Sequence, residues 1–334
     1  MNRREFISLG ACAAAVSGCV GAKGMARRDC ADFDMAVDVI DGTTPFDEGK
    51  RFEALKVLQR EIYAMGKKEP YYDFVNAGPD LSAAEVAAVH EAYPPLKWYD
   101  HAFDKVMREL QEATVTDGKP AVWYVYNMGI VVKTAKCAFS IDLCHRKAPL
   151  LAPFLDFALI THNHDDHFTE AFVKAMRKLK KPVRSNFVLD WNNYSREETA
   201  EAKYADVLVK CTTADHNRYL PKAVTCFECH IGEGAEKFVI FHSGDCWRAA
   251  QLKPSVPHPD LYFGHCAIGL SFKDAWETTM PAKLMVISHH QELGHLGGPW
   301  RCVGFHEEPA SILKTLHELK APVVMPVWGD KIQY

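Results

Sequence analysis

The sequence predicts an α/β protein with a helical extension on its N-terminal side. Within residues 45–113, apolar side chains recur at helical spacing, as at Phe52, Leu55, Leu58 and Ile62. From about residue 122 onward, short apolar runs rich in β-branched and aromatic residues alternate with amphipathic stretches. This alternation predicts mixed sheets covered by helices over residues 114–334.

Composition and charge narrow the classes of function. The chain has 334 residues, of which 48% are hydrophobic and 25% charged, which is typical of a globular protein. Its formal net charge of −4 gives no broad positive field, so no nucleic-acid partner is expected. A small-molecule or lipid-derived substrate remains compatible with this charge.

The first residues are expected to direct export rather than to join the fold. "MNRREFISLGACAAAVSGC" contains the pair Arg3 and Arg4, then a weakly apolar run too short to span a membrane. It resembles a twin-arginine signal ending in a bacterial lipobox at Cys19. We therefore expect an export signal over residues 1–18, lipidation of Cys19 and a tether over residues 19–44. The protein would then be anchored by lipid in the bacterial cell envelope. An ordinary cleaved secretion signal, with Cys19 incidental, is the alternative.

Three helices are expected in the extension. The stretches are "PFDEGKRFEALKVLQREIYAMGKK", "LSAAEVAAVHEAY" and "WYDHAFDKVMRELQEA". Between them, "EPYYDF" and "YPPLKWYD" gather aromatic residues that could line a substrate cleft or form a packing face. Packing is the favoured interpretation, because large aromatic side chains are mostly buried.

A run of potential metal ligands follows one apolar strand. "FALI" is followed by "THNHDDH", which places His162, His164, Asp166 and His167 between a predicted strand and an amphipathic helix. Alternate residues of an extended chain point to the same side, so the first two histidines can share one ion. The last two residues can face a neighbouring position, and imidazole and carboxylate groups are common ligands of zinc.

Two other apolar runs also end at residues that bind metals. "EKFVIFHSGD" ends near Asp245, and "KLMVIS" ends at His289. His216 lies in "CTTADHNRYL". Ligands delivered by several strand ends would form a site on a rigid platform.

Together these residues resemble the metallo-β-lactamase fold superfamily of dinuclear metallohydrolases, over residues 122–328. The segments "NMGIVVKT", "FSIDL", "THNHDDH" and "HSGDC" are most similar to the group of ascorbate-phosphate lactonases and N-acyl phosphatidylethanolamine phospholipases D. The resemblance implies an αββα sandwich. It also implies two divalent metal ions, with zinc favoured and iron or manganese as alternatives.

The resemblance also implies a role for each ligand. One ion would be held by His162, His164 and His216. The second would be held by Asp166, His167 and His289. Asp245 would bridge the two ions, which would share a hydroxide that attacks a carbonyl or phosphorus centre. The expected reaction is hydrolysis of an ester, lactone, amide or phosphodiester, with Asp166 and Asp245 acting in catalysis.

Some ligand assignments have neighbouring alternatives. His290 adjoins His289 and would replace it after a shift of one residue at the strand end. His230 and His242 are alternatives to His216, which is chosen for its position in the chain before Asp245.

Two more histidines are candidates for contact with substrate. His265 follows the predicted strand "LYFG" and is expected to be a leaving-group acid or a substrate contact; the alternative is a half-buried histidine bonded to backbone. His295 is expected either to contact a metal ligand without binding the ion itself or to contact the substrate.

Two other functions compete with hydrolysis. The fold could serve as a catalytically inactive envelope lipoprotein that binds a metal or ligand. Cys226, Cys229 and His230 also form a C-x-x-C-H sequence, the attachment signature of c-type haem. The surrounding residues predict a β-hairpin, in which the two cysteines face opposite sides, and this argues against haem.

Overall fold

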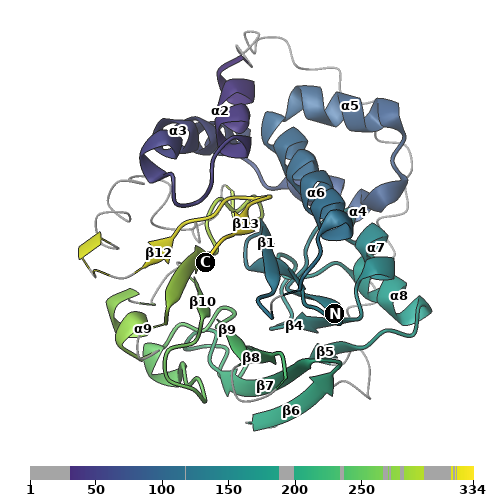
Figure 1. The fold of residues 1–334 in the computed structure, drawn as a ribbon. Coiled ribbons are helices and arrows are strands. Elements are labelled where there is room, and N and C mark those ends of the chain that lie inside the picture. Colours follow the sequence, from purple (N-terminus) through teal and green to yellow (C-terminus); the bar gives the residue numbers. More distant parts are fainter. Residues whose placement is uncertain are drawn as a thin grey trace.

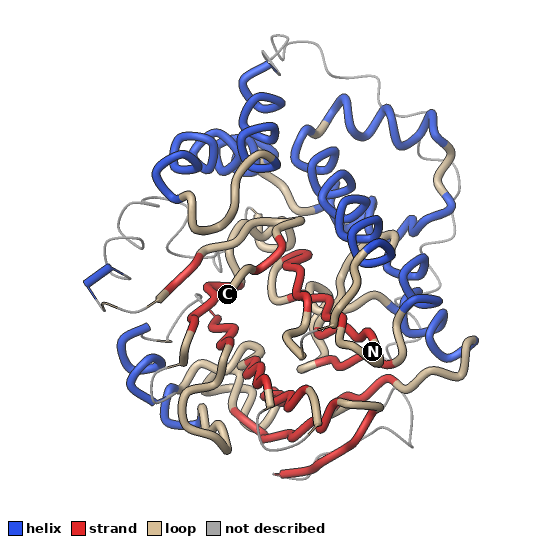
Figure 2. The backbone as a smooth tube through the Cα atoms, viewed as in Figure 1, coloured by secondary structure: helices blue, strands red, loops and turns tan. Residues whose placement is uncertain are grey.

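Two β-sheets lie at the centre of the molecule, and helices lie outside them (Figures 1 and 2). The structure, a computed structural model, describes residues 31–334 apart from 117, 188–198, 234–236, 266–269, 271, 279–281, 297–316, 319 and 321. The predicted α/β architecture with a helical N-terminal extension is confirmed. The predicted export signal and the lipidation site at Cys19 lie outside the described residues.

The extension consists of α3 (Glu48–Met65), α4 (Glu69–Ala77), the short 3-10 helix η2 (Gly78–Asp80), α5 (Ala83–Ala92) and α6 (Pro94–Glu112). α5 begins with a capping box, in which the Ser82 hydroxyl accepts from the Glu85 backbone and the Glu85 carboxylate accepts from the Ser82 backbone. α3 ends at Gly66, whose φ of 65° suits the left-handed conformation that terminates many helices.

One further helix lies within the range predicted as a tether. α2 (Ala31–Asp41) buries Phe33, Ala36 and Ile40. These side chains recur at intervals of three and four residues, so they share one helix face that packs on the core. The polar, glycine-containing composition of residues 19–44 did not indicate this short apolar face.

The first sheet has six strands, in the order β13-β1-β2-β3-β4-β5. They are β1 (Ala121–Tyr126), β2 (Gly129–Lys133), β3 (Ala138–Ile141), β4 (Phe157–Ile160), β5 (Val183–Ser185) and β13 (Lys331–Ile332). β3, β4 and β5 are parallel, so their C-terminal ends meet at one edge.

The second sheet has seven strands, in the order β12-β11-β10-β9-β8-β7-β6. They are β6 (Thr199–Tyr204), β7 (Val207–Ala214), β8 (Val224–Ile231), β9 (Phe238–His242), β10 (Leu261–His265), β11 (Leu284–Ser288) and β12 (Val323–Val324). β9 to β12 are parallel, and β8 and β9 form the predicted antiparallel hairpin.

Shorter helices follow several of the strands. These are α7 (Ala148–Leu151), η3 (Ala152–Phe154), α8 (Glu170–Lys178), η4 (Ala249–Gln251) and α9 (Phe272–Thr278). α8 is capped by Thr169, whose hydroxyl accepts from the Phe172 backbone N–H at 3.2 Å. This cap fixes the point at which the histidine-rich loop after β4 ends and α8 begins.

The extension and the sheets share one continuous core. Trp98 of α6 stacks on Trp328 near the C-terminus, with ring centroids 4.3 Å apart. Buried Arg51 of α3 pairs with buried Asp330 at 2.7 Å. Tyr71 of α4 stacks on Tyr126 of β1, as the packing interpretation of the aromatic stretches predicts.

Strand β8 carries the C-x-x-C-H sequence. Cys226 and Cys229 are both buried, and His230 is bonded through Nε2 to the Glu228 carboxylate at 2.7 Å. Consecutive side chains of a strand point to opposite faces, so the two thiols do not face one ligand. The hairpin therefore gives no support to the haem alternative.

Among the described residues, no helix combines the length and the apolar character needed to cross a bilayer.

Candidate metal centre

The histidine-rich loop begins where β4 ends and is fixed at its first residue. The Thr161 backbone N–H and hydroxyl each donate to a different oxygen of the buried Asp142 carboxylate, both at 2.7 Å. Asp142 follows β3, the parallel neighbour of β4, so adjacent strand ends supply both the loop and its anchor. The Thr161 hydroxyl also contacts His162 Nδ1 at 3.0 Å, which orients that ring.

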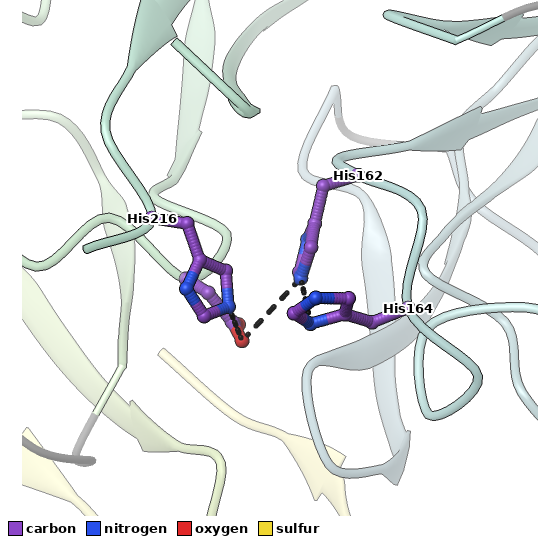
Figure 3. Close-up of side chains that lie close together, drawn as sticks. His162, His164 and His216 are labelled. Carbon is purple, nitrogen blue, oxygen red and sulfur yellow. Dashed lines mark hydrogen bonds and ion pairs between the residues drawn. The ribbon is translucent and has the colours of Figure 1, made fainter. Parts of the chain in front are cut away.

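Four side chains converge on a first position. His162 Nε2 and His164 Nδ1 are 3.0 Å apart, and Figure 3 shows the rings of His162, His164 and His216 turned towards one another. Asp245 Oδ2 lies 3.5 Å from His162 Nε2 and 3.4 Å from His216 Nε2. The ligand atoms of all four residues lie within 4.8 Å of one another, a spacing that one metal ion can bridge.

A second position lies beside the first. Asp166 Oδ2 is 3.6 Å from His167 Nε2 and 3.4 Å from His289 Nε2. Asp245 Oδ1 is 3.2 Å from His167 Nε2, while Asp245 Oδ2 is 3.4 Å from His289 Nε2. The Asp245 carboxylate therefore contacts ligands of both positions, as a bridging residue must.

His265 also faces the second position. Its Nε2 lies 3.6 Å from Asp245 Oδ1, and its ring meets that of His289 edge-on with centroids 4.3 Å apart. Asp245, His265 and His289 form a further group with ligand atoms within 4.8 Å of one another. From the sequence, His265 was expected near the substrate and was not considered as a metal ligand. It lies at the end of β10, between the parallel strands β9 and β11, and this position at a strand end is the feature that could have indicated a ligand.

A layer of polar partners orients the ligands. His167 Nδ1 donates to Asp142 Oδ2 at 2.8 Å, which leaves Nε2 free to face the site. The side-chain amide of Asn127 donates to Asp166 Oδ2 at 2.7 Å. The backbone carbonyl of Asn127 accepts from the His289 backbone N–H at 2.9 Å. One turn between β1 and β2 thus links ligands from two different strands. These partners were not identified from the sequence.

The electrostatics favour a cation between the ligands. Burial lowers the pKa of His162 well below its usual value, so this ring is neutral and has a lone pair to offer. Burial alone would also lower the pKa of His167, but the carboxylates of Asp245, Asp166 and Asp142 raise it well above the usual value. A positive charge is thus stabilised at the centre of these carboxylates, where a divalent ion would supply it.

The donor set fits a pair of metal ions. Among the described residues, His167 Nε2, His216 Nε2 and Asp245 Oδ1 are buried without a hydrogen-bond partner. Leaving such atoms unpaired is costly, and a metal ion would satisfy them. Imidazole and carboxylate donors suit zinc, iron and manganese.

The neighbouring histidines lie elsewhere. His290 is fully buried and stacks on Tyr124, with centroids 5.8 Å apart, whereas His289 faces the ligands. His242 Nε2 donates to the Met128 carbonyl at 2.8 Å, and His230 is bonded to Glu228. The structure therefore brings His289 and His216 to the site, and it places their three alternatives outside it.

A cavity of about 530 Å³ lies between η4 and α9. Trp247, two residues after Asp245, lines it with Arg248, Asp274 and Glu277. The Trp247 backbone N–H donates to the Asp215 carbonyl at 3.3 Å, next to His216. One wall of the cavity thus continues directly into the segments that carry two of the ligands.

No protein-family model and no curated protein matches the chain. Among solved structures, it is similar to Igni18, a metallo hydrolase from Ignicoccus hospitalis, with 16% identity, a TM-score of 0.49 and coverage of 64% of this chain and 98% of the other. YhfI, a metallo-beta-lactamase fold protein from Bacillus subtilis, matches with 14% identity and a TM-score of 0.45, over 66% and 94% of the two chains. CmlA, a diiron beta-hydroxylase from Streptomyces venezuelae, matches with 11% identity and a TM-score of 0.47, over 66% and 55%. All three TM-scores lie below 0.5.

Proposed function

We propose that the protein is a metal-dependent hydrolase that uses two neighbouring divalent ions. The observation that carries this proposal is the Asp245 carboxylate, which contacts histidines of both positions within 3.6 Å. His162, His164 and His216 would hold one ion with Asp245. Asp166, His167 and His289 would hold the other, with zinc as the favoured metal.

Such ions would supply Lewis acidity and lower the pKa of water, so that a nucleophile is available near neutral pH. The chain's own contribution is to fix the ligands and to hold the proton acceptor in its ionised form. Burial would raise the pKa of Asp166, but His167 and His289 keep it well below the usual value. Asp166 is therefore ionised at neutral pH, which is the form that binds a metal ion; we propose that it also acts as a weak base towards attacking water.

His265 supports this function as a metal-facing group rather than as a proton donor. Burial lowers its pKa to about 3, against the opposing effect of Asp245. At neutral pH the ring is neutral, so it is not the imidazolium cation that could donate a proton to a leaving group. The neutral imidazole is the form that binds a metal ion. The sequence suggested a leaving-group acid or a substrate contact at His265, and we propose a metal-facing group as a further role.

We further propose that the substrate is a small or lipid-derived molecule with an ester, lactone, amide or phosphodiester bond. The cavity beside Trp247 is large enough for a small molecule, and it combines an aromatic wall with charged groups of both signs. Lipidation at Cys19 would hold the protein at the envelope membrane, in reach of lipid-derived substrates.

The experiment is to strip the full-length protein with a chelator, restore it with zinc, and assay chromogenic phosphodiester, lactone and ester substrates. Activity should return with zinc. Asp245→Asn should reduce the activity by more than the roughly 10–100-fold loss expected when a residue that hydrogen-bonds to a metal ligand is replaced. Asp38→Asn, at an exposed position of α2, is the matched control and should leave it unchanged. Zinc-independent hydrolysis, or full activity of Asp245→Asn, would overturn the proposal.

A further inference from the structure

A third group of ligand-type side chains lies next to the second metal position. It consists of Asp166, Glu292 and His295, whose ligand atoms lie within 4.8 Å of one another. Glu292 and His295 belong to the loop that follows β11. This loop is held in place by Leu293, whose backbone N–H donates to the Tyr126 hydroxyl at 2.9 Å.

Glu292 is the member of this group that lacks an adequate partner. Its side chain is fully buried, and one carboxylate oxygen, Oε2, contacts His295 Nδ1. The other oxygen, Oε1, has no hydrogen-bond partner within the described part of the chain. A buried carboxylate oxygen without a partner is costly, and Asp166 adds a second negative charge close by.

Next to Glu292 Oε1, residue 294 has no side chain. A Cβ atom at Gly294 would lie 2.7 Å from Glu292 Oε1 and 3.0 Å from the Tyr72 hydroxyl. The glycine thus leaves room where two oxygen atoms approach from different segments. Tyr72 comes from α4, so the helical extension contributes to this side of the metal centre.

We propose that Asp166, Glu292 and His295 form a third site, which binds a divalent cation beside the two ions of the centre. The inference rests on the proposed function, because Asp166 also serves the second position. A cation there would neutralise the two buried carboxylates and satisfy the unpartnered oxygen. Mixed oxygen and nitrogen donors suit zinc or manganese.

The third ion should be held more weakly than the other two. Its site has three protein ligands, one of them shared, which leaves coordination positions open for water or substrate. The His295 side chain is 39% exposed, so the site opens to solvent on that side. It should therefore lose its ion first during dialysis and could engage an oxygen atom of the bound substrate.

The test is equilibrium dialysis of the chelator-stripped full-length protein against increasing zinc, with bound metal counted by plasma mass spectrometry. The wild type should bind two equivalents tightly and a third more weakly. Glu292→Gln, which keeps the side-chain shape, should bind two. Glu53→Gln, on an exposed face of α3, is the matched control and should keep all three.

His295→Gln provides a second measurement at a half-exposed position, where misfolding is less of a concern, and it should also bind two equivalents. The two tight ions that remain in each variant report that the fold is intact. A wild type that saturates at two equivalents, or variants that still bind three, would overturn the third site while leaving the proposed function standing. A wild type that binds no zinc would overturn both.

Discussion

At the scale of single residues, the site depends on side chains that contact no metal position themselves. Asp142 accepts from the Thr161 backbone and hydroxyl and from His167 Nδ1, so one buried carboxylate fixes both the loop and the tautomer of a ligand. Asn127 orients Asp166 in the same way. The sequence motif predicted four candidate ligands because they are adjacent in the chain, whereas these partners depend on which strands become neighbours.

Replacing Asp142 should weaken metal binding without removing a ligand. In Asp142→Asn, the amide can present a donor to His167 Nδ1, which disfavours the tautomer that keeps Nε2 free. Metal affinity should fall by about 10–100-fold, as measured by competition with a chromophoric chelator. Asp38→Asn is the control. An unchanged affinity in Asp142→Asn would show that the carboxylate does not set the tautomer.

Replacing His265 distinguishes a metal-facing group from a proton donor. Since burial lowers its pKa to about 3, His265 is neutral across the range from pH 5 to 9 and contributes no limb to the pH–rate profile there. We expect His265→Gln to weaken binding of the second ion and to leave the shape of the profile unchanged at saturating metal. If the alkaline limb of the pH–rate profile is lost in this variant, His265 acts as a proton donor and the prediction is wrong.

At the scale of secondary-structure elements, α6 is joined to the first sheet by a buried ion pair. Asp100 of α6 accepts from Arg146, which lies just after β3, and both side chains are almost fully buried. Burial would raise the pKa of Asp100, but bonds from His90 and Arg146 hold it well below its usual value. The pair therefore stabilises the fold above the unfolded-state pKa of about 3.9.

Asp100→Asn should destabilise the protein by about 3–5 kcal/mol at pH 7, because Arg146 would be left buried and unpaired. Urea unfolding measures this difference. The wild type's advantage should persist down to about pH 4 and shrink as the pH falls towards the lower, folded-state pKa of Asp100. Asp104→Asn, on the same helix but half exposed, should cost at most about 1 kcal/mol. Equal costs for the two variants would contradict this account of α6.

The elements also show where prediction from sequence was sufficient. Apolar runs and periodicity predicted α3, α5, α6 and the hairpin of β8 and β9, because each depends mainly on local pattern. α2 was not predicted, since its buried face consists of a few residues in a polar segment. The contribution of Glu292 could not be predicted, because it arises when the loop after β11 folds back towards Asp166.

At the scale of the whole molecule, the helical extension and the sheets form one core rather than two separate ones. Trp98 of α6 and Trp328 near the C-terminus stack within this core, and Arg51 of α3 pairs with Asp330. The sequence predicted a boundary near residue 113 from the change in periodicity, but periodicity carries no information on whether two regions share a core.

Trp98→Ala should therefore destabilise the entire protein, by about 3–5 kcal/mol. Because the core is continuous, unfolding should remain a single transition when followed both by far-ultraviolet circular dichroism and by loss of bound metal. Two separate transitions, with metal retained after the helices melt, would contradict the shared core.

In the proposed function, Asp245 joins two neighbouring metal ions. The most direct measurement is electron paramagnetic resonance of the full-length protein loaded with two equivalents of manganese. A bridging carboxylate should give a spin-coupled spectrum in the wild type, and Asp245→Asn should lose the coupling. A spectrum of isolated ions in the wild type at two equivalents would contradict the claim.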